Sequence, residues 1–318
     1  MELPVSLEIC VYNIENLFIQ KASPELPPYT PYKTEEKLNQ LKKVFEDINA
    51  DIYCLSEVGG IESLEYFNKH YLDDNYHCAL IEGNSDRGIE IGYLIKKGLN
   101  LRFAQYTYRN HPIGFNYPHE KRWAEEDGEY KLPTYYMSRD LSELQIFSHE
   151  DKEKKNPIGI IFLVHLKSQR DPDGIDPRSQ RRREAELEFS LKNFYKTQEK
   201  YPNIPIIICG DFNGNASEFS TDEEFKKIYE YYHLSDVLSI ADLPQDRRPT
   251  YFLFNGQNKL PIQLDYAFID KNKSHLVQDI AIYRYKNNND SVKQLPRTKY
   301  DVWNNPSDHY PIVFRLDI

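Results

Sequence analysis

The sequence has few of the residues that mark a disulfide-stabilised or zinc-binding protein. Its 318 residues include only four cysteines, and no two of them form a CxxC pair. Cys10, Cys54 and Cys209 lie within apolar runs typical of strands, and with Cys78 we expect them to be small buried side chains. The spacing argues against structural zinc, whereas a disulfide between neighbouring strands stays open.

Long apolar segments and an excess of positive charge are also missing. No stretch is long enough to span a membrane. Met1 to Pro4 lack the basic start and apolar run of a signal peptide, so we expect a cytoplasmic protein without stable membrane association. The formal net charge is −10, which argues against a polycation that coats nucleic acid. Affinity for nucleic acid should then be local and metal-dependent, and no obligate protein partner is evident.

What the chain does have is ample apolar and aromatic material, at 40% and 14% of residues. Apolar runs predict strands over 7–12, 51–57, 92–95, 144–147, 158–164, 204–209, 263–269 and 310–316. Helical spacing predicts helices over 34–49 and 180–195. The strand over 204–209 is nearly all apolar, so we expect it to be central and covered on both faces.

The order of these segments predicts a layered α/β protein. Polar, turn-rich insertions occur over 24–31, 111–133 and 286–304. No linker or repeat divides the chain. Residues able to do chemistry occur from Asn13 to His309, so we predict a single domain over 1–318.

Carboxylates stand where predicted strands end. Glu57 follows one strand, although a solvated or helix-capping Glu would fit the same position. Asp211 and Asn213 follow the most apolar strand, and alternation would place both on one side of an extended chain. The alternative is a simple turn, since Asp, Asn and Gly214 are typical turn residues.

The third group of candidate site residues is a histidine with two possible carboxylate partners. Asp308 precedes His309, and Asp265 lies in an apolar strand where its charge must be paired. A carboxylate behind an imidazole fixes its tautomer, and the ring can then stabilise a phosphate oxygen. The alternative is a structural Asp and a surface His.

A polar loop after the strand over 158–164 could bind phosphate. It carries His165, Lys167, Ser168 and Arg170. The basic residues that follow, Arg178, Arg181, Arg182 and Arg183, could contact a nucleic-acid backbone. They open a helix that also carries Glu184, Glu186 and Glu188, so we expect a solvated, ion-paired face instead.

Taken in order, these segments resemble the endonuclease/exonuclease/phosphatase superfamily. Tyr12 to Phe18 resemble the family's opening Asn motif, and Asp51 to Val58 resemble its Glu motif. The remaining matching segments are Asp86 to Gly92, Ser138 to Leu141, His165 to Ser168, Gly210 to Asn213, Leu264 to Tyr266 and Ser307 to His309. The sequences of these motifs are most similar to those of bacterial nuclease-like members.

The resemblance implies a four-layer α/β/β/α sandwich of two mostly antiparallel mixed sheets flanked by helices. It implies Mg²⁺-dependent attack of water on a phosphate ester, with Mn²⁺ as a possible substitute. Glu57 would be the main metal ligand, with Asn13 and Asp308 nearby. Asp211 and Asn213 would position the water, and His309, oriented by Asp265, would stabilise the transition state. His165 would grip or protonate the phosphate, and Arg87, Arg139 and Lys167 would contact substrate.

One position departs from the family pattern. The Asn often found two residues before the family His is replaced here by Leu163. The favoured function is a nuclease acting on DNA or RNA. A phosphatase or phospholipase-C-type hydrolase acting on inositol phosphates or lipid head groups would use the same mechanism. A binding protein without turnover would be expected to have lost site residues such as Glu57 or His309, and none is missing.

Overall fold

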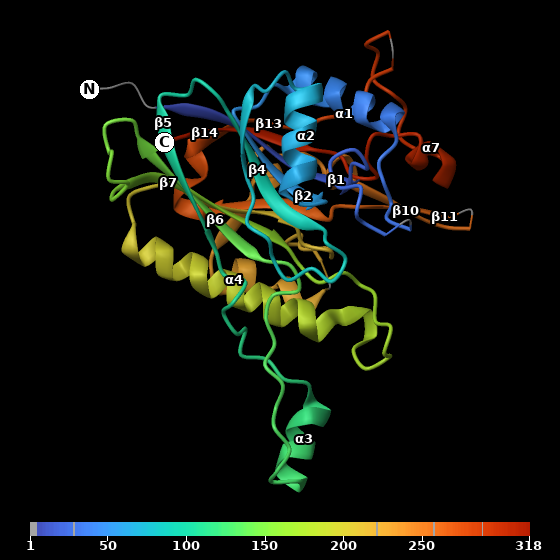
Figure 1. The fold of residues 1–318 in the computed structure, drawn as a ribbon. Coiled ribbons are helices and arrows are strands. Elements are labelled where there is room, and N and C mark those ends of the chain that lie inside the picture. The colour runs from blue at the N-terminus through green and yellow to red at the C-terminus, as the bar shows by residue number, and fades with distance from the viewer. Residues whose placement is uncertain (1–4, 28, 221, 257, 288) are drawn as a thin grey trace.

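Two six-stranded sheets pack face to face, with helices on both outer faces (Figure 1). This computed structural model describes residues 5–27, 29–220, 222–256, 258–287 and 289–318. Met1 to Pro4, on which the signal-peptide expectation depends, lie outside the described residues, as do single positions within the expected insertions over 24–31 and 286–304. In the described ranges no helix is both long and apolar enough to span a membrane.

The strands are β1 (Ser6–Leu17), β2 (Ile52–Val58), β3 (Tyr76–Ala79), β4 (Glu90–Lys96), β5 (Leu101–Thr107), β6 (Leu141–Ser148), β7 (Pro157–His165), β8 (Ile206–Asp211), β9 (Leu234–Asp236), β10 (Tyr251–Asn255), β11 (Asn258–Ile262), β12 (Asp265–Asp270), β13 (Val277–Ile282) and β14 (Ile312–Asp317). The α-helices are α1 (Glu35–Ile48), α2 (Ile61–Tyr71), α3 (Pro118–Glu126), α4 (Gln180–Lys200), α5 (Lys227–Glu230), α6 (Val237–Ile240) and α7 (Lys299–Trp303).

The first sheet has the order β13-β14-β1-β2-β4-β3, and the second has the order β5-β6-β7-β8-β12-β9. Each sheet contains one parallel pair near its centre, β1 with β2 and β7 with β8, and the other pairs are antiparallel. Parallel neighbours end at the same edge of a sheet. This arrangement brings the ends of β1, β2, β7 and β8 to one side of the molecule.

Three apolar clusters hold the layers together. The middle cluster joins the sheets through residues such as Val11 and Cys54 on one side and Ile161 and Cys209 on the other. An outer cluster packs α1 and α2 on the first sheet, and another packs α4 on the second. The predicted four-layer sandwich is therefore confirmed.

The long periodic segments were predicted correctly. Thr34 caps α1 by accepting a hydrogen bond from the Lys37 N–H, and every residue of β8 is buried. The predicted helix over 180–195 extends to Lys200. The short elements β3, β5, β9, β13 and α2 were not predicted, nor was the β10–β11 hairpin. Cys78 is only half-buried, contrary to expectation, and none of the four cysteines forms a disulfide.

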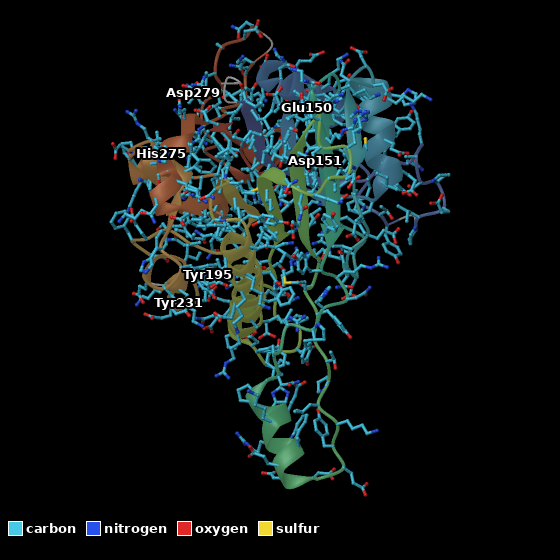
Figure 2. The ribbon with its side chains drawn as sticks, turned by 90° about the vertical axis from the view of Figure 1, so that its left-hand side faces the viewer. Glu150, Asp151, Tyr195, Tyr231, His275 and Asp279 are labelled. Atoms are coloured by element: carbon cyan, nitrogen blue, oxygen red, sulfur yellow. The ribbon has the colours of Figure 1, made fainter. Side chains whose placement is uncertain are left out.

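The expected insertion over 111–133 forms a projecting arm. It leaves the second sheet after β5, carries α3 at its tip and returns to β6 (Figures 1 and 2). Aromatic contacts stabilise it, including the edge-to-face packing of Tyr117 on Tyr135. The arm begins at the end of the sheet where β7 reaches His165. Glu150 and Asp151, labelled in Figure 2, lie in the loop at the opposite end of β6 and β7.

Candidate active site

The candidate site forms where strands of both sheets end together. In the second sheet, Asp211 at the end of β8 lies opposite His165 on β7 and opposite Asp265 on β12. The first sheet supplies Asn13 from β1, whose Nδ2 donates a hydrogen bond to Asp211 Oδ2 at 3.0 Å. Residues nearly 200 positions apart therefore meet across the two sheets.

Asp211 is the buried centre of this group. Its side chain accepts hydrogen bonds from Asn13 on one oxygen and from the Asn213 N–H, at 2.8 Å, on the other. Burial raises the pKa of Asp211 to about 7, with a further contribution from the Asp265 charge, while His309 acts in the opposite direction. A carboxyl group with this pKa can accept a proton near neutral pH.

Asn213 lies in a turn, and the expectation of an extended chain from Asp211 is wrong. Its φ angle is 52°, in the left-handed region that Asn tolerates better than most residues. The Asn213 Nδ2 donates to the Leu166 carbonyl at 2.9 Å, which links the turn to the loop after β7. The side chain still lies beside Asp211, although local turn geometry places it there.

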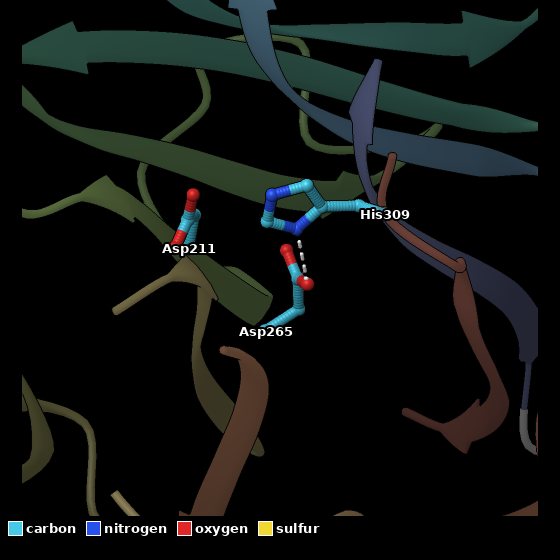
Figure 3. Close-up of side chains that lie close together, drawn as sticks. All are labelled: Asp211, Asp265 and His309. Carbon is cyan, nitrogen blue, oxygen red and sulfur yellow. Dashed lines mark hydrogen bonds and ion pairs between the residues drawn. The ribbon is translucent and has the colours of Figure 1, made fainter. Parts of the chain in front are cut away.

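His309 and Asp265 form a buried pair facing Asp211 (Figure 3). The distance between His309 Nδ1 and Asp265 Oδ2 is 2.7 Å. Burial alone would lower the pKa of His309, but the charge and hydrogen bond of Asp265 raise the pKa well above its usual value. The ring is therefore held as an imidazolium cation, which can stabilise negative charge on a phosphate oxygen.

Backbone contacts fix both members of this pair. The Ser307 hydroxyl donates to the Asn13 carbonyl at 2.8 Å and accepts from the His309 N–H at 3.1 Å. The Thr250 hydroxyl accepts hydrogen bonds from the backbone of Leu264 and Asp265. Since Ser307 joins the loop before β14 to β1, His309 has its position only when both ends of the chain are folded.

His165 is enclosed on the opposite side of Asp211. Its Nε2 lies 3.7 Å from Asp211 Oδ2, and its side chain is 2% exposed. Among the described residues, its Nδ1 has no hydrogen-bond partner. Burial, with the charges of Arg139 and His309, lowers the pKa of His165 well below its usual value. A neutral ring can donate a hydrogen bond but is a poor source of protons.

Three carboxylates gather on the β1–β2 side of the site. They belong to Glu15, Glu57 and Asp308. Burial and the charges of Glu15 and Glu57 raise the pKa of Asp308 to about 6. Glu57 Oε2 accepts a hydrogen bond from the Asn16 N–H at 3.1 Å, and both residues have positive φ angles. Carboxylate oxygens are the donors that a hard divalent cation prefers, so the residues present fit such an ion, with Glu15 Oε2 also paired with Lys37 Nζ at 2.8 Å.

The geometry limits what one of the expected metal ligands could contribute. Asn13 uses its amide on Asp211 and its oxygen on the Glu15 N–H, so its contribution to a cation is limited. Asp211, Asp265 and His309 also offer ligand atoms within 4.8 Å of one another. The Nδ1 of His309 is already paired with Asp265, however, and we interpret this trio as a proton-handling group.

A buried lysine borders the three carboxylates. Lys33 Nζ donates to the Pro306 carbonyl at 3.0 Å and lies 3.8 Å from Glu15 Oε2. Burial lowers the pKa of Lys33 to about 8. Its contact with Pro306 ties the ammonium group to the segment that leads into Ser307 and His309. Lys33 therefore both offsets negative charge and supports this loop.

The residues predicted to contact substrate differ in exposure. Arg87 is exposed and donates to Asn16 Oδ1 at 3.0 Å, which places it beside β1. Arg139 is buried and donates to the Leu166 carbonyl at 3.3 Å. Lys167 and Ser168 are half-buried, and Arg170 is exposed. All lie in or next to segments that carry the central group.

The expected solvated face of α4 is wrong for two of its arginines. Arg182 and Arg183 are buried, because Arg182 pairs with Glu186 and Arg183 pairs with Glu224. Arg183 also donates to the Lys167 carbonyl at 3.2 Å. The acidic residues of the same helix predicted the Arg182–Glu186 pair correctly, but not the partner of Arg183, which is Glu224, nor the burial of both arginines.

Sequence reasoning missed three residues at the site. Glu15 was missed because its φ angle of 50° interrupts the alternation of β1. Lys33 was missed because it reaches the site only through tertiary contacts with Pro306 and Glu15. Tyr251 forms a bridge with His309, and their ring centroids are 5.0 Å apart. Glu15 lies within the Tyr12 to Phe18 motif, which was the one available signal.

The model of the Endonuclease/Exonuclease/phosphatase family matches residues 10–309. The chain belongs to this family. Membership makes it an enzyme of the phosphoric ester hydrolase class, nuclease-like in kind, and supports phosphodiesterase or nuclease activity. No curated protein matches the sequence significantly.

Solved structures with the same fold include eukaryotic and bacterial proteins. D. rerio TDP2 complexed with a single-strand DNA product is 15% identical, with a TM-score of 0.60 over 98% of this chain and 99% of that chain. The human Nocturnin catalytic domain with bound sulfate is 18% identical, with a TM-score of 0.59 over 99% and 95%. A Bacteroides thetaiotaomicron protein of the same family is 15% identical, with a TM-score of 0.59 over 99% and 95%. At these identities the likeness shows the fold.

Proposed function

We propose that this chain, acting as a single domain over 1–318, is a divalent-metal-dependent phosphodiesterase that hydrolyses DNA or RNA. The observation that carries the proposal is the buried His309–Asp265 pair facing Asp211, with the carboxylates of Glu57 on β2 and Asp308 in the loop before β14. This group supplies a proton acceptor, Asp211, and a fixed positive charge, the His309 imidazolium, close to each other. In-line displacement at phosphorus needs both.

Asp211 is proposed to take the proton from the attacking water, with Asn213 beside it to orient that water. The oxygen of the water forms a bond to phosphorus while the bond to the leaving oxygen breaks. The hydrogen bond from Asn13 to Asp211 keeps the carboxylate in one rotamer. Because the pKa of Asp211 is raised to about 7, this carboxylate can take the proton at neutral pH.

His309 is proposed to stabilise the charge that builds on the phosphoryl oxygens. Asp265 holds the proton on Nδ1, so that Nε2 can donate to the phosphate. Donors that are already aimed at such charge do not need to reorganise during the reaction. His165, neutral and buried against Asp211, is proposed to donate a hydrogen bond to the phosphate.

Glu57, Asp308 and Glu15 are proposed to hold the divalent cation, with Asn13 at the edge of the group. Mg²⁺ is the proposed ion and Mn²⁺ a substitute; the cation would neutralise phosphate charge and lower the pKa of a bound water. Arg87, Arg139, Lys167, Ser168 and Arg170 are proposed to contact the substrate phosphates. The D. rerio TDP2 structure with single-strand DNA supports a nucleic-acid substrate on this fold.

The decisive experiment incubates supercoiled plasmid, single-stranded DNA and RNA with wild-type protein, with Mg²⁺, Mn²⁺ or EDTA. The same substrates are offered to His309→Ala and to His275→Ala. His275 is an exposed histidine far from the site, labelled in Figure 2, and serves as the matched control. We expect cleavage that requires a divalent cation and His309 and is unchanged in the control.

Two results would contradict the proposal. Cleavage that persists in EDTA or in His309→Ala would assign the activity to another site or a contaminant. If folded wild-type protein cleaves no nucleic acid but releases phosphate from inositol phosphates or phosphocholine from vesicles, the substrate class is wrong while the site remains.

A further inference from the structure

A groove of about 760 Å³ lies between the β10–β11 hairpin and α7. Its walls include Tyr251, Phe252 and Phe254 from β10, and Tyr300 and Trp303 from α7. Figure 1 shows α7 and the hairpin on the same side of the molecule. The helix follows a long irregular segment in the sequence, and nothing in the proposed chemistry uses it.

The groove is continuous with the candidate active site. Glu15 and Asp308, two of the proposed cation ligands, line its inner end. Tyr251 lines the groove as well, and its ring packs on His309. A phosphate held at the site would therefore direct the next part of its molecule along the groove.

The aromatic side chains of α7 are unusually exposed. Tyr300 is 68% exposed and Trp303 is 72% exposed. They stand three residues apart on one helix, so they share a face. A Thr298–Asp301 capping box fixes the start of this short helix, and its contacts with β10 hold it in place. The ring faces are thus presented by a positioned element, open to a ligand.

The groove is lined by side chains of both charges. The inner end carries Glu15 and Asp308, and Lys299 lines the wall. Lys259 Nζ lies 4.6 Å from the centroid of the Phe252 ring, and Arg297 precedes α7. A ligand in the groove would therefore have the acidic side chains of the site, flat aromatic rings and the Lys299 ammonium group along its walls, with Lys259 close by.

We propose that this groove is a base-stacking subsite for single-stranded nucleic acid, with Trp303 and Tyr300 as the stacking surface. The inference rests on the proposed function, since it gives the substrate strand beside the reacting phosphate a place to lie. Phosphates and unpaired bases match the combination of cationic side chains and aromatic rings in and beside the groove. Duplex bases already stack on each other and would not offer their faces, whereas an acyl chain would not use the cationic groups.

The test uses the fact that the chain has only two tryptophans. In a Trp123→Phe, His309→Ala protein with Mg²⁺, Trp303 is the single tryptophan and cleavage is blocked. Titration with a single-stranded oligodeoxythymidylate should quench its emission. An oligonucleotide of equal length and charge with abasic residues should bind at least tenfold more weakly, because each stacked base contributes about that factor or more.

Variants separate stacking from other effects. Binding in the Tyr300→Ala, Trp303→Ala double variant is followed by anisotropy of a labelled oligonucleotide, and we expect a dissociation constant raised at least tenfold. Tyr231→Ala removes an aromatic ring that is equally exposed, at 72%, on another part of the surface and should leave binding unchanged.

Three outcomes would overturn the inference. These are equal affinity for normal and abasic strands, an unchanged dissociation constant in the double variant, and quenching of Trp303 by phosphatidylcholine vesicles but not by oligonucleotides. If the proposed function itself is wrong, the wild-type protein will not cleave nucleic acid, whatever the binding measurements show. Cleavage that needs His309 but not the two rings would overturn the groove alone.

Discussion

The Nδ1 of His309 lies 2.7 Å from the Asp265 carboxylate, in surroundings from which water is excluded. A buried ion pair in this geometry determines both the charge and the orientation of the imidazole. Its neighbour Asp211 is also buried, so the balance of charge among the three groups depends on each of them.

Asp265→Asn should lower activity by about a hundredfold or more, because the His309 ring loses the group that keeps it charged and aligned. The sign for pH follows from the raised pKa of His309. Without Asp265 that pKa falls, the protonated ring is lost at lower pH, and the alkaline limb of the rate profile moves to lower pH. Rates of oligonucleotide cleavage across pH measure both effects, and an unmoved alkaline limb would contradict the assigned role.

Glu57→Gln should raise the concentration of Mg²⁺ needed for half-maximal activity by roughly ten- to a hundredfold, since it removes one charge from the group around Asp308. Titration of activity with Mg²⁺ measures the change. Glu62→Gln provides the control, because Glu62 lies on α2 just beyond β2 and outside the carboxylate group. Equal metal requirements in the two variants would remove Glu57 from the proposed ligands.

Asp140 should make folding stability depend on pH. Burial raises its pKa to about 7, although Thr107 and the Tyr108 N–H donate hydrogen bonds to it. Between its unfolded pKa near 4 and about 7, the folded state binds the proton more tightly, so the contribution of Asp140 to stability falls as pH rises through this range. The total is a few kcal/mol.

Urea denaturation of wild-type protein and Asp140→Asn at several pH values tests this dependence. The stability difference between the two proteins should change in favour of the variant as pH rises from 4 to 7. Asp246→Asn, at an exposed position, should show a constant difference from wild type. A difference for Asp140→Asn that does not vary with pH would mean that its carboxyl group titrates normally.

Glu224→Ala should destabilise the protein by about 3–5 kcal/mol, because it leaves the Arg183 guanidinium buried without its partner. Arg183 also donates to the backbone of Lys167 and Arg178, so activity should fall through displacement of the loop after β7. Denaturant unfolding measures the first effect. Glu153→Ala, in an ion pair that is 71% exposed on both sides, should leave stability within experimental error.

Gly210→Ala should strongly destabilise the protein. The φ angle of Gly210 is 131°, and a Cβ atom there would lie 1.9 Å from the Val164 carbonyl oxygen on the paired strand. Backbone on both sides of such a clash has to move, at a cost of about 3 kcal/mol or more. Gly128→Ala, where no atom lies within 4 Å, is the matched control. Wild-type stability in Gly210→Ala would contradict the geometry of this strand pair.

Strands and helices with a long, regular apolar pattern could be predicted from the sequence. The runs that became β1, β2, β7, β8 and α1 bury continuous apolar faces, and the polar residues directly after them follow from their position. His309 and Asp265 were placed together because an isolated charge on an apolar strand needs a partner. The motif resemblance then gave the order of the layers.

Other features depended on contacts that no local pattern records. Positive φ angles occur at four residues of the site, Glu15, Asn16, Glu57 and Asn213. This backbone conformation breaks the alternation from which side-chain direction is predicted. Arg183 is typical of a solvated helix until the segment containing Glu224 covers it. The α7 groove requires the hairpin and the segment before Ser307 to meet, which is a tertiary event.

The pairing of β1 with β14 has a consequence for biosynthesis. Residues 6–11 pair with residues 312–317, and Ser307 bonds to Asn13. Residues 6–11 therefore lack this partner strand until residues 312–317 have been synthesised, and His309 cannot reach Asp265 in its final geometry before then.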